Sequence, residues 1–156
     1  MNIVLNHNEF KISDFYFADK KRNVIIDGLF TKIIYSNDHV SMGGIYFNMP
    51  FKKVDVIKRD KEIYLQYNTT IECNAMLIDE LTKIEYQILD YYRKMNQLTT
   101  NISTVLSRRL YSGSIKCHTL TNASNSQNIN VVVKISGIWE TSNEIGLAIK
   151  FIPIIA

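Results

Sequence analysis

The sequence reads TTIECNAMLIDELTKIEYQILDYYRKM over residues 69–95, and this stretch decides the fold class. Its apolar residues recur three or four positions apart, which is the periodicity of one face of an α-helix. Thr69 and Glu72 have the spacing of a capping box, in which two side chains satisfy backbone N–H groups at a helix start. The stretch predicts one long amphipathic helix over about 69–95, with a core-facing stripe of Leu77, Leu81, Ile84, Ile88, Tyr91 and Met95.

The segments on both sides of this helix are typical of β-strands. Before the helix, runs of apolar, aromatic and β-branched residues alternate with turn residues and predict strands within Phe10–Phe17, Val24–Tyr35, Ile45–Met49, Val54–Ile57 and Ile63–Tyr67. After it, Ser114–Leu120 predicts a strand, and Ile129–Glu140 with Ile145–Ile152 predicts a terminal hairpin. In the last strand Ile145, Leu147, Ile149 and Phe151 share one face. Residues 102–110 fit a short second helix or a mobile loop, and residues 121–128 a polar loop.

Strands on both sides of one helix predict an α+β fold, mainly β, in a single domain over residues 1–156. Two architectures agree with this order. One is an antiparallel sheet, and the other is a small oligonucleotide/oligosaccharide-binding-like (OB-like) barrel with the long helix inserted between strands. Hydrophobic residues make up 46% of the chain, which is enough for a core that needs no disulfides or metals.

The charge balance is mildly basic, with a formal net charge of +3. Residues 96–156 carry five Lys/Arg against two Asp/Glu, whereas residues 69–95 carry three against five. A basic surface beside an acidic helix is compatible with a polyanionic partner. The two cysteines lie far apart, and the first residues lack a secretory signal, so we expect an intracellular, non-secreted protein with free thiols. No apolar stretch approaches the roughly 20 residues that cross a bilayer, so no membrane partner is expected.

Residue patterns for catalysis or metal binding are not found. The histidines are His7, His39 and His118, and only His118 has a cysteine neighbour, Cys117. Adjacent strand residues point to opposite faces, so these two are not expected to act as a dyad. No ligand spacing suggests zinc, and no phosphate-binding glycine motif is present. We therefore expect no enzyme activity, no cofactor and no metal.

Basic and aromatic residues are interleaved in several segments, as in proteins that bind single-stranded nucleic acid without sequence preference. Such proteins neutralise phosphates with Lys and Arg and stack bases on exposed rings. The candidate binding residues are Lys32, Tyr35, Tyr46, Lys52, Lys53, Arg108, Arg109, Tyr111, Lys116 and Lys134. Trp139 shares the terminal hairpin with Lys134 and Lys150. Its burial is favoured because it is in line, at every second position, with Val131, Val133, Ile135 and Gly137.

Two segments resemble a small protein family of nucleocytoplasmic large DNA viruses. The first is DGLFTKIIYS, residues 27–36, followed by Gly44-Ile45-Tyr46, and the second is KISGIWET, residues 134–141, with IGLAIKF at 145–151. Gly-Ile-Trp-Glu is the most specific piece. Such viruses encode single-stranded-DNA-binding proteins, some of them similar to the podophage type, which has an OB barrel with a long helix. The podophage type ends in an acidic tail, whereas residues 151–156 are the apolar FIPIIA.

Two functions agree with these observations. The first is non-sequence-specific binding of single-stranded DNA, or of RNA, in viral replication or repair, in the host cytoplasm, the nucleus or a virus factory. The second is a non-enzymatic structural or assembly protein, virion-associated and homo-oligomeric. The apolar Ile152–Ile155 and the many aromatic residues favour the second.

Overall fold

A computed structural model describes residues 3–117 and 129–155 of the chain. Its strands are β1 (Val4–Leu5), β2 (Phe15–Phe17), β3 (Lys21–Arg22), β4 (Leu29–Ser36), β5 (Ser41–Gly43), β6 (Ile45–Met49), β7 (Asp55–Arg59), β8 (Glu62–Gln66), β9 (Asn101–Ser103), β10 (Ser114–Cys117), β11 (Ile129–Glu140) and β12 (Glu144–Ile155). Its helices are α1 (Glu72–Met95) and α2 (Val105–Tyr111), and two 3-10 turns, η1 (His7–Glu9) and η2 (Ile12–Asp14), precede β2.

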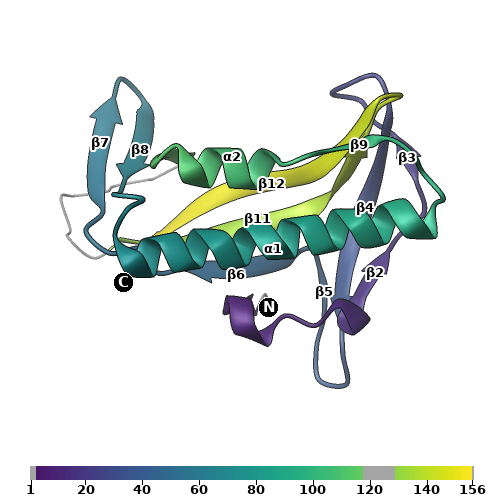
Figure 1. Cartoon of the computed structure of the whole chain (residues 1–156), viewed down its shortest axis with the longest axis horizontal. Coiled ribbons are helices and arrows are strands. Elements are labelled where there is room, and N and C mark those ends of the chain that lie inside the picture. Colours follow the sequence, from purple (N-terminus) through teal and green to yellow (C-terminus); the bar gives the residue numbers. More distant parts are fainter. Residues whose placement is uncertain (1–2, 118–128, 156) are drawn as a thin grey trace.

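The main sheet is built around β11. One edge of β11 pairs with β12 along nearly its whole length. The other edge pairs first with β6, over residues 131–135, and then with β4, over residues 137–140. Parallel β1 and β9 lie beyond β6 and β12, and β2, β3 and β5 pair with β4. A separate three-stranded sheet, β10-β8-β7, lies at one end of α1 (Figure 1).

The α+β, mainly β class with one long helix is confirmed. Figure 1 shows α1 lying lengthwise across one face of the main sheet, with α2 beside it. The sheets of the described residues are open, so a closed OB-like barrel is not confirmed. Residues 102–110 hold the end of β9 and most of α2. The strands predicted over 10–17 and 24–35 are shorter than expected. The last three residues of the strand predicted over 114–120, and the whole loop predicted over 121–128, lie outside the described residues.

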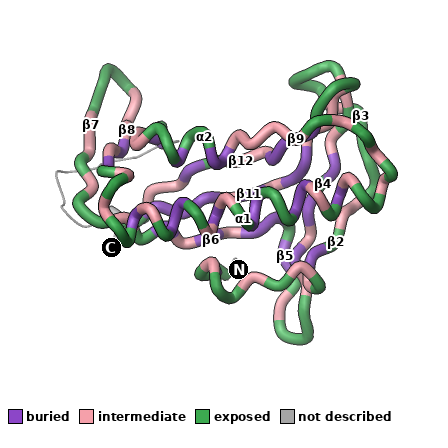
Figure 2. The backbone as a smooth tube through the Cα atoms, in the orientation of Figure 1, coloured by how far each residue is buried: buried purple, intermediate pink, exposed green. Residues whose placement is uncertain are grey.

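The core lies between α1 and the sheet (Figure 2). Leu77, Leu81, Ile84 and Ile88 are buried as their spacing predicts. The stripe then continues at Tyr92, which is fully buried, whereas Tyr91 and Met95 are exposed. The step from Ile88 to Tyr92 is four residues, and at 3.6 residues per turn either three or four is compatible with one face.

The helix start differs from the capping-box prediction. The first helical residue is Glu72 and the N-cap is Ile71, which has no side-chain cap. Thr69 precedes the N-cap by two residues, so its hydroxyl is not in the capping position. The buried Asn74 instead joins the helix start to the preceding loops. Its Oδ1 accepts from the Lys52 N–H at 2.8 Å, and its Nδ2 donates to the carbonyls of Lys52 and Asn68.

A β-bulge divides β11 into two halves. Ile135 pairs with Ile149 and Gly137 with Ala148, so Ser136 is an extra residue outside the ladder, and its hydroxyl donates to the carbonyl of Ala148 at 3.3 Å. Because strand side chains alternate between faces, one extra residue exchanges the faces of all residues that follow. Val131, Val133 and Ile135 point into the core, but Gly137 and Trp139 lie on the opposite face. The expectation that Trp139 is in line with the core valines is therefore wrong.

Candidate nucleic-acid interface

The face of the main sheet opposite α1 and α2 gathers basic and aromatic side chains. The inward positions of β4 are Thr31, Ile33 and Tyr35, all buried. Phe30 and Lys32 alternate with them and point outward, as do their cross-strand partners Trp139 and Gly137. Similarly, Tyr46 lies opposite Lys134, and Lys134 lies opposite Lys150. We name this surface the open face, defined by Phe30, Lys32, Tyr46, Lys134, Trp139 and Lys150.

Two aromatic rings of the open face lie directly on glycines. A Cβ added to Gly137 would be 2.4 Å from Cζ of Phe30, and one added to Gly146 would be 2.2 Å from Cζ2 of Trp139. Any other residue at these glycines would displace the rings. Phe30 and Trp139 are both half-buried, so each ring rests on the sheet and keeps part of its surface exposed. Fixed, partly exposed rings are suitable platforms for stacking.

The three lysines of the open face have no ion-pair partner among residues 3–117 and 129–155. Lys134 and Lys150 are directly opposite each other on paired strands, an arrangement of like charges that costs stability. Lys134 Nζ lies 5.6 Å from the ring centroid of Tyr46. The side chain of Lys32 lies against Gly43, and that of Lys134 near the next residue, Gly44. The lysines thus form one unneutralised cationic group.

Three of the ten sequence-predicted residues, Lys32, Tyr46 and Lys134, lie together on the open face. Tyr35 does not, because it occupies an inward position of β4 and is only 3% exposed. Its hydroxyl donates to Asp14 Oδ2 at 3.3 Å, and burial together with the Asp14 charge raises its pKa. The Tyr35 ring is therefore not available for stacking.

The other predicted residues lie away from the open face. Arg108, Arg109 and Tyr111 are exposed on α2, where the Tyr111 hydroxyl donates to Asp79 Oδ1 at 2.6 Å. Lys116, on β10, forms an ion pair with Glu62 that holds the pKa of the Glu62 carboxyl below its usual value. The remaining two, Lys52 and Lys53, are exposed in the loop before β7.

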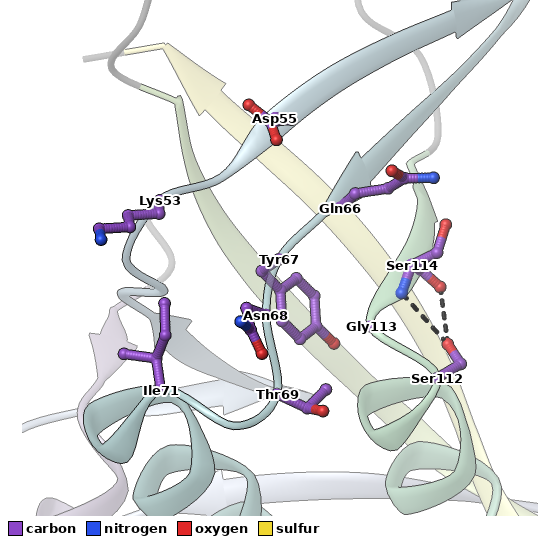
Figure 3. Close-up of a pocket in the computed structure, with 10 residues that line it drawn as sticks. All are labelled: Lys53, Asp55, Gln66, Tyr67, Asn68, Thr69, Ile71, Ser112, Gly113 and Ser114. Carbon is purple, nitrogen blue, oxygen red and sulfur yellow. Dashed lines mark hydrogen bonds between the residues drawn. The ribbon is translucent and has the colours of Figure 1, made fainter.

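Lys53 lines a cavity that is distinct from the open face. This cavity is about 650 Å³ and lies where the β10-β8-β7 sheet meets the helices (Figure 3). The Tyr67 ring beside it is stacked on Phe51, with centroids 3.9 Å apart, and burial raises the pKa of Tyr67. Lys53 and Asp55 are its only charged lining residues in the described part of the chain. This lining offers hydrogen-bonding groups without a concentrated charge.

Sequence reasoning missed Phe30, Trp139 and Lys150 as members of the interface. Lys150 and Trp139 belong to the hairpin that it identified, but the bulge reversed the face assigned to Trp139. The available signal was the pair Gly137 and Gly146 on neighbouring strands, because strand glycines mark places where another group approaches closely.

A polar network joins α1 to the inner face of the sheet. The buried Tyr92 hydroxyl shares a hydrogen bond with Thr31 Oγ1 at 3.0 Å and donates to Glu140 Oε1 at 2.7 Å. Lys20 Nζ lies 3.2 Å from the same Glu140 oxygen. Burial is the main cause that raises the pKa of Tyr92 to about 12. These groups satisfy one another and leave the network with a structural role.

The described residues contain no group of three or more His, Cys, Asp or Glu side chains placed to hold a metal ion. None of the described helices combines the length and apolarity required to cross a bilayer. Comparison of the chain with protein-family models, with curated proteins and with solved structures found no match in any of the three.

Proposed function

We propose that this protein binds single-stranded nucleic acid, with DNA as the main ligand, through the open face and without sequence preference. The observation that carries the proposal is the placement of three lysines without an ion-pair partner in the described chain among three outward aromatic side chains, Phe30, Tyr46 and Trp139, on a sheet face that no described helix covers. The lysines would contact phosphates while successive bases stack on the rings. The family resemblance supports a role in the replication or repair of a large DNA virus inside the infected cell.

The proposal predicts a measurable salt dependence. For single strands, the slope of log K against log salt is about −0.7 per neutralised phosphate, so three lysines give a slope near −2. Anisotropy titrations of labelled oligo-dT across a potassium chloride series measure this slope. The variant Lys32→Ala/Lys134→Ala/Lys150→Ala should lose about tenfold or more in affinity at low salt, and its slope should fall towards zero.

A matched control removes the same charge elsewhere. Lys83 and Lys94 lie on α1, and Lys61 lies in the β7–β8 turn. The triple alanine variant of these residues has the same net charge as the open-face variant and should retain both the affinity and the slope. If wild-type protein does not bind oligo-dT at low salt, or if the two triple variants behave alike, the proposed interface is wrong.

The aromatic contribution is separable from the ionic one. Tyr46→Ala should weaken binding by the roughly 1–3 kcal/mol typical of one stacked base while leaving the salt slope unchanged. Tyr86→Ala, on an exposed turn of α1, is the control and should bind normally.

One observation favours the second candidate function, assembly with another protein or another copy of this chain. Val24 and Ile25 are 96% and 89% exposed at the tip of the β3–β4 connection. Large exposed apolar side chains are typical of contact surfaces. Light scattering tests this function: a mass that rises with concentration, and returns to that of a monomer in Val24→Ser/Ile25→Ser, would support assembly.

A further inference from the structure

A hollow of about 440 Å³ lies at one end of the open face, lined by residues of the β3–β4 connection, β4 and the β11–β12 hairpin. Figure 1 shows these elements together at one end of the main sheet. Its apolar lining is formed by Ile25, Ile26, Phe30, Trp139 and Ala148. The volume is within the roughly 300–1,000 Å³ of small-molecule sites. We name it the Trp139 hollow.

The apolar walls of the Trp139 hollow are held in place before any ligand arrives. Phe30 and Trp139 are fixed by their close approach to Gly137 and Gly146. On the other side, Asn23 closes a turn: its Oδ1 accepts from the Ile25 N–H at 3.0 Å. The turn presents Ile25 to solvent, so a flat apolar ligand between this residue and the rings would cover exposed apolar surface.

Among the described residues, the polar rim of the hollow offers free acceptors and no charged donor. The hydroxyl oxygen of Thr141 already accepts a hydrogen bond within the protein, from the N–H of Glu144 at 3.1 Å. The exposed carboxylates of Asp27 and Glu144 also line the hollow, and neither has a hydrogen bond or ion pair within the described residues. A ligand that matches this rim has a flat apolar body and N–H donors on its edge.

We propose that the Trp139 hollow receives one base of the bound strand and selects bases that carry an exocyclic amino group over thymine. This inference rests on the proposed function, because the lysines of the open face would bring the strand to the hollow. Cytosine presents an N4 amino donor to a carboxylate, whereas thymine presents its O4 acceptor at the same position. Carboxylates on the rim would accept a hydrogen bond from the cytosine amino group and would repel the O4 oxygen of thymine.

Cytosine and thymine are the informative pair, since both are pyrimidines of similar size. A well-formed hydrogen bond between a base edge and a side chain discriminates by about tenfold or more. Trp139 is the only tryptophan in the sequence, so its fluorescence reports on the hollow directly. Oligo-dC and oligo-dT of equal length are titrated into the protein at one salt concentration, and both quenching and affinity are recorded.

Oligo-dC should bind about tenfold more tightly than oligo-dT and quench Trp139 more strongly. In Asp27→Asn/Glu144→Gln the ratio should fall to about one, with oligo-dT binding unchanged or tighter. Asp38→Asn/Asp60→Asn, which removes two exposed carboxylates in other turns, should keep the wild-type ratio. Thermal unfolding verifies that both variants are folded.

Two results overturn the inference alone. They are equal binding of the two oligonucleotides by wild-type protein, and a dC preference that survives in Asp27→Asn/Glu144→Gln. In both cases oligo-dT still binds, and the proposed function is unaffected. Absence of binding by either oligonucleotide overturns the inference together with the proposed function.

Discussion

Glu85→Ala should be one of the most destabilising substitutions on the surface of α1 that faces α2. Glu85 is 0% exposed, and its carboxylate replaces the missing side-chain cap of α2. Oε2 accepts from the N–H of Leu106 at 2.7 Å, and Oε1 accepts from the N–H and the hydroxyl of Ser107 at 3.0 and 2.6 Å. An acidic side chain of one helix thus satisfies the first free N–H groups of another.

The magnitude follows from the groups left behind. Removing the carboxylate leaves the N–H groups of Leu106 and Ser107 buried without an acceptor, and each such group costs about 1–3 kcal/mol. Taking about 1.5 kcal/mol for each gives a loss of about 3 kcal/mol in the free energy of unfolding. For a chain of this length, that corresponds to a decrease of roughly 6–12 °C in Tm.

Urea unfolding at pH 7, followed by circular dichroism, measures this loss, and hydrogen exchange locates it at the amides of Leu106 and Ser107. Glu85→Gln keeps one acceptor and should lose about half as much. Glu80→Ala, which removes a partly exposed ion pair with Lys83 on the same helix, should change stability by about 0.5 kcal/mol or less. A loss below about 1 kcal/mol in Glu85→Ala, or unchanged amide protection, would refute the capping role.

Three further predictions concern other groups. Gly146→Ala should displace the Trp139 indole from the sheet, shift its fluorescence to longer wavelength, and lower stability by about 1–3 kcal/mol in thermal unfolding. The pKa of Tyr92 is raised to about 12, above the ordinary value of 10.0, so its contribution to stability is complete below pH 10 and is lost as pH rises through about 12. Urea midpoints measured between those pH values should fall less steeply in Tyr92→Phe. Of the two thiols, the exposed Cys73 should react rapidly with a disulfide reagent, whereas Cys117, whose pKa burial raises to about 11, should react only on unfolding; equal rates would contradict this assignment.

The sequence predicts the long helix and the terminal hairpin well because both have a strong period. Twenty-four residues of α1 repeat one apolar face, and the inward residues of β12 alternate strictly. The helix start is predicted less well. Thr69 and Glu72 match a local capping pattern, but the hydrogen bond that holds the helix start joins Asn74 to a loop more than twenty residues away in the chain. Tertiary contacts of this kind leave no local signature.

The candidate site could be predicted only in part. Val131, Val132 and Val133 are all apolar, so this run does not say which face of β11 is inward. Tyr35 and Lys32 alternate on β4 as strand residues must, but the sequence does not reveal that the aromatic member points inward. Both assignments depend on pairing with strands that are distant in sequence, which is why placing the open face required the structure.

The bulge at Ser136 makes the composition of two sheet faces depend on one residue that stands outside the ladder of β11 and β12. Deletion of Ser136 would leave Gly137 directly after Ile135, so Trp139 and Glu140 would stay on the faces that they now occupy. If Ser136 instead took a regular place in the ladder, every residue after it would change face. The Trp139 indole would then point towards α1, and the Glu140 carboxylate, which now meets Tyr92 and Lys20, would point to solvent. A chain of the same length with a regular β11 would therefore lose an interface and a buried anchor together.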